Sequence, residues 1–161
     1  MRTDVKRRGW TISAEGNDLA DRFLESVFFT GNGRMGARGY PAYRPIRRPL
    51  DAGLFLAGFY DRISDSTELT DFVNLPTPIW YQIRLNGRIP AIPSHLSRAL
   101  DLRTGLLTFR YRLSIADDWV DVQEQRFFSL AKPSFLFQRL EFQGRGQVEL
   151  LAGIDHQKIG R

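Results

Sequence analysis

The sequence predicts an all-β domain of mainly antiparallel strands, with the architecture of a β-sandwich. Apolar and polar residues alternate with a period of two over several segments between residues 79 and 154, which is typical of half-buried strands. Turn-forming residues separate these segments at short intervals, and no helical pattern lies between them. A sandwich or barrel is therefore favoured over an α/β sheet. The length of 161 residues suits one domain with its own core.

The first third of the chain is less regular than the rest. Leu19, Phe23 and Leu24 have helical spacing after a capping Asn17, whereas the following run is β-branched and aromatic. Glycines and prolines then interrupt any regular element. The expected elements are an arm or edge strand over residues 1–16, one or two helical turns over 17–26, a buried strand over 27–30 and a long ordered loop over 31–50.

From residue 53 onward the pattern is that of strands joined by turns. Residues 53–60 form an almost continuous apolar run, which predicts a central strand buried on both faces. Asn86-Gly87 and Asp117-Asp118 predict turns, because these residue types tolerate turn conformations. The further strands are predicted over residues 79–85, 94–102, 107–114, 119–129, 135–142 and 148–154.

Composition limits the classes of function. The net charge of +5 comes almost entirely from arginines spread along the chain, so solvated strand faces explain them better than a nucleic-acid footprint. No apolar run approaches the ~18 residues of a membrane span, and no secretory signal opens the chain. The absence of cysteine excludes disulfides and thiolate sites. The cytoplasm is the expected compartment.

The stretch after residue 30 is rich in glycine. Gly31-x-Gly33-x-x-Gly36 matches the dinucleotide-binding fingerprint, and Asp51 lies about twenty residues further on. That fingerprint requires a helix to open at its last glycine, and Gly39, Pro41 and Pro45 prevent one here. We therefore expect a turn at Asn32-Gly33, and close backbone approaches at Gly36 and Gly39, in place of a nucleotide site.

Several short motifs resemble, in the same order, the N-terminal region of glycoside hydrolase family 65. This family contains inverting phosphorylases of maltose, trehalose, kojibiose and related α-glucosides. The resemblance covers about residues 20 to 143. Its motifs are Glu25-Ser26, Gly31-Asn32-Gly33-x-x-Gly36-x-Arg38-Gly39, Ala57-Gly58-Phe59-Tyr60-Asp61, Asn74-Leu75-Pro76, Ile83-x-Leu85-Asn86-Gly87, Leu100 to Leu107 and Gln125 to Ser129.

The resemblance implies a β-sandwich of the galactose-mutarotase-like supersandwich type, complete or incomplete, spanning residues 1–161 as one domain. It implies that the catalytic acid and the phosphate site belong to an (α/α)₆ barrel following such a sandwich. There a carboxylic acid protonates the glycosidic oxygen, and inorganic phosphate acts as co-substrate and nucleophile. The implied partners are that barrel, the disaccharide substrate and a second copy in a homodimer. No cofactor, metal or catalytic residue is expected in this chain, which should be inactive alone.

Four residues are candidates for contacts with a substrate or with another domain: Asn32, Arg38, Tyr60 and Trp80. Sugar recognition uses aromatic faces and planar hydrogen-bonding groups, which these residues and Tyr81 supply. The alternative, which we favour, is that Tyr81 packs in the core, Trp80 covers a sheet face or an interface, and Asn32 adopts a left-handed turn conformation. We further hypothesise that residues 32–39 face the catalytic barrel, where carboxylates or backbone carbonyls hold Arg38.

Other polar residues give no site. His95 and His156 lie far apart without ligand-spaced companions, so surface or satisfied histidines are expected rather than a metal centre. No pair of carboxylates is marked as an acid/base couple. Two other functions remain open: an independent carbohydrate-binding module, and, with less support, a basic domain that binds nucleic acid or another anion.

Overall fold

The computed structural model describes residues 4–16, 22–43, 53–62 and 70–155. These ranges contain thirteen strands and one short helix. Their bounds are β1 Lys6–Arg8, β2 Thr11–Gly16, α1 Arg22–Val27, β3 Thr30–Gly31, β4 Met35–Ala37, β5 Leu54–Leu56, β6 Tyr60–Arg62, β7 Thr70–Phe72, β8 Thr77–Leu85, β9 Leu96–Asp101, β10 Leu106–Ile115, β11 Asp118–Phe128, β12 Leu136–Arg145 and β13 Val148–Asp155.

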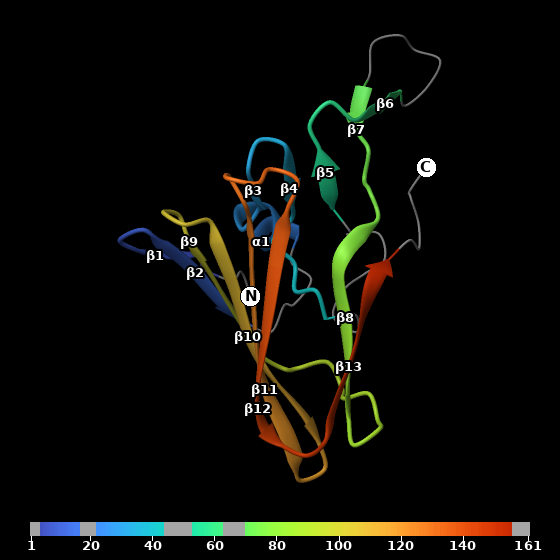
Figure 1. Cartoon of the computed structure of the whole chain (residues 1–161). Helices are drawn as coiled ribbons and strands as arrows, with labels where there is room; N and C mark the ends of the chain where they lie inside the picture. Colours follow the sequence, from blue (N-terminus) through green and yellow to red (C-terminus); the bar gives the residue numbers. More distant parts are fainter. Residues whose placement is uncertain (1–3, 17–21, 44–52, 63–69, 156–161) are drawn as a thin grey trace.

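One antiparallel sheet of six strands forms the larger layer, in the order β1-β2-β9-β10-β11-β12 (Figure 1). The longest ladder joins β11 to β12, from Trp119 opposite Arg145 to Phe128 opposite Leu136. Strands β1 and β2 form a hairpin at one edge of this sheet, where an arm or an edge strand was expected over residues 1–16. Neighbouring strands in the order β9 to β12 follow one another along the chain, as hairpin connections require.

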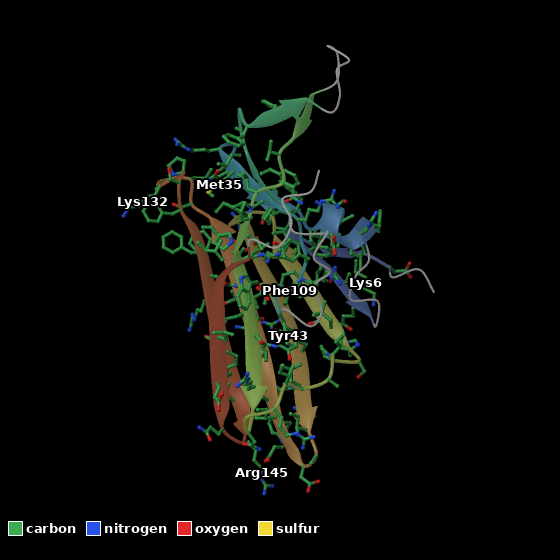
Figure 2. The ribbon with its side chains drawn as sticks, turned by 90° about the vertical axis from the view of Figure 1, so that its right-hand side faces the viewer. Lys6, Met35, Tyr43, Phe109, Lys132 and Arg145 are labelled. Atoms are coloured by element: carbon green, nitrogen blue, oxygen red, sulfur yellow. The ribbon has the colours of Figure 1, made fainter. Side chains whose placement is uncertain are left out.

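The second layer is the antiparallel pair of β8 and β13, which faces the larger sheet. Alternate residues of β8, from Thr77 to Leu85, are buried, and so are the facing residues of β10 and β11. Tyr43 and Phe109 lie between the layers (Figure 2). The buried core confirms the predicted sandwich, because both sheets turn one face toward it.

The turns between the long strands largely follow the expected chemistry. Asn86 and Gly87 both have positive φ angles, of 51° and 74°, as a hairpin turn of the primed type requires. The Asn86 backbone N–H donates to the carbonyl of Gln147 at 2.9 Å, and the Asn86 side-chain oxygen accepts from the Gln147 N–H at 2.8 Å. This turn is therefore tied to the connection that carries the chain from β12 to β13. The other predicted turn begins one residue early, at Ala116, because Asp118 already opens β11.

Two small sheets lie at one end of the sandwich: β3-β4-β5, and the pair of β6 and β7 (Figure 1). The strand predicted over residues 53–60 is wrong in its length and its place. Strand β5 ends at Leu56, the φ of Gly58 is +82°, and Phe59 and Tyr60 are exposed. A glycine in a left-handed conformation breaks an apolar run that composition alone predicts as one buried strand.

The predicted strand over residues 27–30 is also wrong, because the helix extends through Val27. Leu24 and Phe28 are both buried, and the Phe28 N–H donates to the Leu24 carbonyl at 2.9 Å. Burial of residues four apart requires a helical turn, which outweighs the strand propensity of single residues. Asn17, Leu19 and residues 44–52 lie outside the described ranges, and β4 interrupts the loop expected from residue 31. The one helix in the described ranges is not long and apolar enough to span a membrane.

Candidate functional site

The glycine-rich stretch forms the hairpin of β3 and β4, and a hollow of about 490 Å³ opens beside it. Strand β5 pairs with β4 and supplies the far wall. The hollow is mainly apolar, with two arginines at its margin. Its lining includes Phe29, Arg34, Met35, Arg38, Phe55 and Tyr60.

Two glycines let neighbouring segments approach this hairpin. A Cβ on Gly36 would lie 2.6 Å from the ring of Phe29, and one on Gly39 would lie 2.5 Å from the carbonyl oxygen of Phe28. Real Cβ atoms essentially never approach so closely, so a side chain at Gly39 would displace the Phe28 backbone, and one at Gly36 would displace the Phe29 ring. The first contact leaves the Phe29 ring lying along the hollow, 6.3 Å from the ring of Phe55 between centroids. Because Gly36 is followed by strand and not by helix, no dinucleotide fingerprint forms.

The side chain of Asn32 links the tip of the β3–β4 hairpin to the segment that follows β11. Its side-chain oxygen accepts the backbone N–H groups of Arg34 and Met35, at 3.0 and 2.9 Å. Its amide nitrogen donates to the carbonyls of Ser129 and Pro133, at 2.8 and 3.0 Å. Both ends of the amide are therefore used within the protein. The left-handed conformation expected at Asn32 is wrong, since Gly33 adopts it instead, with a φ of +83°.

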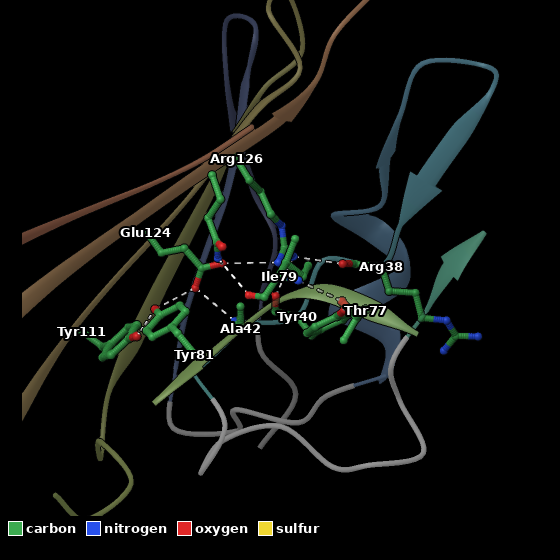
Figure 3. A network of polar contacts seen from close by, with 10 residues as sticks. Arg38, Tyr40, Ala42, Thr77, Ile79, Tyr81, Tyr111, Glu124 and Arg126 are labelled. Atoms are coloured by element: carbon green, nitrogen blue, oxygen red, sulfur yellow. Dashed lines mark hydrogen bonds and ion pairs between the residues drawn. The ribbon is translucent and has the colours of Figure 1, made fainter. Parts of the chain in front are cut away.

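The backbone carbonyl and the side chain of Arg38 point in opposite directions. Its carbonyl oxygen accepts a hydrogen bond at 3.0 Å from the guanidinium of Arg126, which comes from the interior of β11. Its own guanidinium turns away from this network (Figure 3) and lines the hollow. Within the described residues this guanidinium has no hydrogen bond or ion pair. Arg38 is thus half-buried, and its permanently charged, planar donor group makes no hydrogen bond to the described part of the chain.

A buried polar network supports the segment that follows the hairpin (Figure 3). Arg126 and Glu124 are both inaccessible to solvent and form an ion pair at 3.3 Å. Arg126 also donates to the Tyr40 carbonyl at 2.5 Å, while Glu124 accepts the Ala42 N–H at 3.0 Å. Two strand residues of the larger sheet therefore fix residues 38–42 through their backbone, as buried charges require multiple partners.

Burial sets the acid–base properties of this network. Burial raises the pKa of Glu124 above its ordinary value, although the nearby Arg126 and the hydrogen bonds from Ala42 and Tyr81 oppose the rise. Burial also raises the pKa of Tyr81, whose hydroxyl donates to Glu124 at 3.0 Å and contacts the Tyr111 hydroxyl. Tyr81 packs in the core as expected. Glu124 is enclosed and paired, so it is suited to holding structure and not to transferring protons to a substrate.

The remaining candidate residues do not all lie at the hollow. Tyr60 joins Arg38 at the hollow and is 54% exposed. Trp80 does not line the hollow: it lies on the outer face of β8, opposite Gly153, where a Cβ would come within 3.3 Å of the indole. His95 is the one histidine within the described ranges, and His156 and Asp51 lie outside them. The structure therefore brings together Arg38 and Tyr60, with Asn32 at the tip of the same hairpin.

The importance of Glu124 and Arg126 was not predicted, although the sequence contained a signal. Both have the same strand parity as the buried Val120 and Val122, so the alternation places two charges on the apolar face. Charged residues on such a face require partners. Arg126 also belongs to one of the motifs that resemble family 65, and it binds the carbonyl of Arg38 in another.

Comparisons with known proteins agree with these motifs. Residues 14–161 match the model of the family described as glycosyl hydrolase family 65, N-terminal domain. The trehalose 6-phosphate phosphorylase of Lactococcus lactis subsp. lactis (strain IL1403) is 26% identical over 123 residues, which cover 70% of this chain and 16% of that protein.

A solved structure described as a kojibiose phosphorylase from the human microbiome shares the fold, with a TM-score of 0.75 at 15% identity. The match covers 91% of this chain and 21% of that one. The chain thus spans between a sixth and about a fifth of the length of these two relatives.

Proposed function

Because the chain belongs to the N-terminal domain family of glycosyl hydrolase family 65, we propose that it is the non-catalytic β-sandwich of an enzyme acting on α-glucosidic disaccharides. In this role the chain supports a catalytic (α/α)₆ barrel and the assembly of the enzyme. The barrel supplies the acid, and inorganic phosphate is the co-substrate of the whole enzyme. The surface of this chain that contacts the barrel lies within the described residues.

The observation that carries this proposal is the hollow beside the β3–β4 hairpin. Its apolar lining is open to solvent: Phe29 is 44% exposed and Tyr60 54%. An open apolar surface with charged residues at its margin is characteristic of a protein interface. The guanidinium of Arg38, which has no partner among the described residues, suits a carboxylate or a set of carbonyl groups on the opposing surface.

The sandwich also has an open edge between β12 and β13. Leu150 of β13 lies opposite the buried Ile83 and so shares the strand parity of the buried face, yet it is exposed. Strand β12 forms the border of the larger sheet, and among the described strands it pairs with β11 alone. Unpaired edges and exposed inward-facing side chains are normally covered by further structure, which supports a role within a larger assembly.

The test uses a polypeptide that joins this chain to a family 65 catalytic barrel. We expect Arg38→Ala to lower the rate of phosphorolysis several-fold or to lower the unfolding temperature of the joined protein. Arg84→Ala is the matched control, because Arg84 is an exposed strand arginine on β8, away from the hollow. Wild-type kinetics and wild-type stability in Arg38→Ala would remove the interface proposal.

A further inference from the structure

A second hollow lies on the outer face of the six-stranded sheet, away from the hairpin. It has a volume of about 620 Å³ and shares no lining residue with the hollow beside β3 and β4. We name it the polar trough and define it by Arg110, Arg112, Asp121, Gln123, Glu141 and Gln143. The strand register places these residues in two rows that cross β10, β11 and β12.

The side chains of the trough hold one another in place across the strands. Arg110 Nε donates to Gln123 Oε1 at 2.7 Å, and Gln123 Nε2 donates to Glu141 Oε2 at 2.6 Å. In the second row Arg112 forms a bidentate pair with Asp121, at 2.6 and 2.7 Å. Side chains fixed in this way lose little rotamer freedom when a ligand binds, which favours affinity.

Unused hydrogen-bonding groups remain at the open side of the trough. The two terminal nitrogens of Arg110, the amide of Gln143 and the ring of His95 have no hydrogen bond to any described residue. Donors and acceptors are therefore both available. Two arginines and two carboxylates lie within the trough, and Arg139 beside it also pairs with Glu141. The carboxylates next to the arginines weaken the attraction of the site for an anion.

Aromatic residues lie beyond both ends of the trough on the same face. At one end the guanidinium of Arg112 lies over the Trp119 ring, with its central carbon 4.2 Å from the ring centroid. At the other end Phe127 and Phe137 stack with centroids 5.1 Å apart, and both rings are partly exposed. Trp119 and Phe127 are eight residues apart on one strand, a span of about 27 Å.

We propose that the polar trough binds a neutral oligosaccharide. Hydroxyl groups both donate and accept hydrogen bonds, which matches a surface with fixed donors and acceptors in alternation. Sugar rings also present C–H faces that pack on aromatic rings, and the partly exposed rings of Phe127 and Phe137 offer such a surface beyond one end. At the other end Arg112 covers the Trp119 ring. The carboxylates beside the arginines argue against a phosphate or a nucleic acid, and the polar centre argues against a protein, whose interfaces bury an apolar core. This inference stands independently of the catalytic barrel.

The test measures binding of maltoheptaose to the full chain by titration calorimetry, with inorganic phosphate as the anionic probe. We expect saturable binding of the oligosaccharide, with little dependence on salt, and no binding of phosphate. Arg110→Ala and Gln123→Ala should each weaken binding by about tenfold or more. Arg84→Ala, on the other sheet, should bind as the wild type does.

Thermal unfolding of each variant distinguishes loss of the binding site from loss of the fold. Glu141→Gln keeps the shape of the side chain and should also weaken binding. No saturable binding up to about 10 mM oligosaccharide would overturn the proposal. Equal binding by the wild type, Arg110→Ala and Gln123→Ala would also overturn it, as would phosphate binding that depends on Arg110.

Discussion

The guanidinium of Arg126 donates a hydrogen bond to the backbone carbonyl of Arg38 at 3.0 Å, across 88 residues of sequence. A buried charge of the larger sheet thereby fixes the segment whose side chain lines the hollow. The contact leaves the Arg38 guanidinium free to face outward (Figure 3). The interior of the sandwich and the shape of the candidate interface are thus set by the same residue.

Arg126→Met should destabilise the fold strongly. The substitution leaves Glu124 in the core without its ion-pair partner, and removal of one member of a buried pair costs about 3–5 kcal/mol. The measurement is the free energy of unfolding in urea. Arg112→Met is the matched control, because Arg112 pairs with Asp121 at the surface and should change this free energy little. Equal effects of the two substitutions would contradict the role of Arg126.

The stability of the protein should depend on pH through Glu124. Burial raises the pKa of this carboxyl above 4.5, so the folded state binds the proton more tightly than the unfolded chain does. Its contribution to the free energy of unfolding is therefore full below pH 4.5 and decreases as the pH rises through the raised pKa. The difference in this free energy between the wild type and Glu124→Gln should accordingly decrease from acidic toward neutral pH.

The contribution of Asp121 to the free energy of unfolding should change with pH in the opposite direction to that of Glu124. Its hydrogen bond with Arg112 lowers the pKa of Asp121 below 3.8. Its contribution is therefore present above pH 3.8 and lost as the pH falls through the lowered pKa. Urea unfolding of Asp121→Asn over the same pH range checks this direction. A Glu124 difference that grew with pH would show that burial does not dominate its pKa.

Gly39→Ala should destabilise the protein more than Gly36→Ala does. The new methyl at Gly39 would meet the backbone of Phe28, whereas at Gly36 it would meet mainly the ring of Phe29, which can move. Overpacking against a fixed backbone costs about 1–3 kcal/mol. Thermal unfolding of both variants measures the order, and the reverse order would mean that the Phe28 backbone can yield.

Asn32→Ala should destabilise the β3–β4 hairpin by removing four hydrogen bonds. The carbonyl of Ser129 and the N–H of Met35 are both part-buried partners that lose an interaction, and the expected cost is about 1–3 kcal/mol. Asn32→Asp keeps the acceptor for Met35 but loses the donor to Ser129. Amide hydrogen exchange at Met35 should therefore increase in Asn32→Ala and remain slow in Asn32→Asp. Equal exchange in both would contradict the division of roles.

The long strands could be predicted because one face of each is buried and the other solvated. Ile79, Tyr81 and Ile83 show this period directly, and the buried face of β8 confirms it. The short elements near the β3–β4 hairpin could not be predicted, because a short apolar run there fits a strand, a helix or two separate segments equally well. In residues 53–60 a left-handed glycine divides the run, and before Thr30 the burial of Leu24 with Phe28 selects a helix.

The candidate site was predicted in part for a similar reason. Local sequence marks Asn32, Gly36 and Gly39 as turn and contact positions, and the structure gives each of them such a role. The partnership of Arg38 with Arg126 depends on two segments 88 residues apart. Long-range pairing of this kind leaves no periodic trace, apart from the charges on the buried face of β11.

The most direct test of the central claim compares two proteins in one assay of phosphorolysis. The chain alone, incubated with maltose, trehalose or kojibiose and inorganic phosphate, should form no glucose 1-phosphate. The same chain joined to a family 65 barrel should form it from one of these disaccharides, and Arg38→Ala in the joined protein should reduce the yield. Turnover by the chain alone would contradict the account, because it would place a reaction centre within the sandwich.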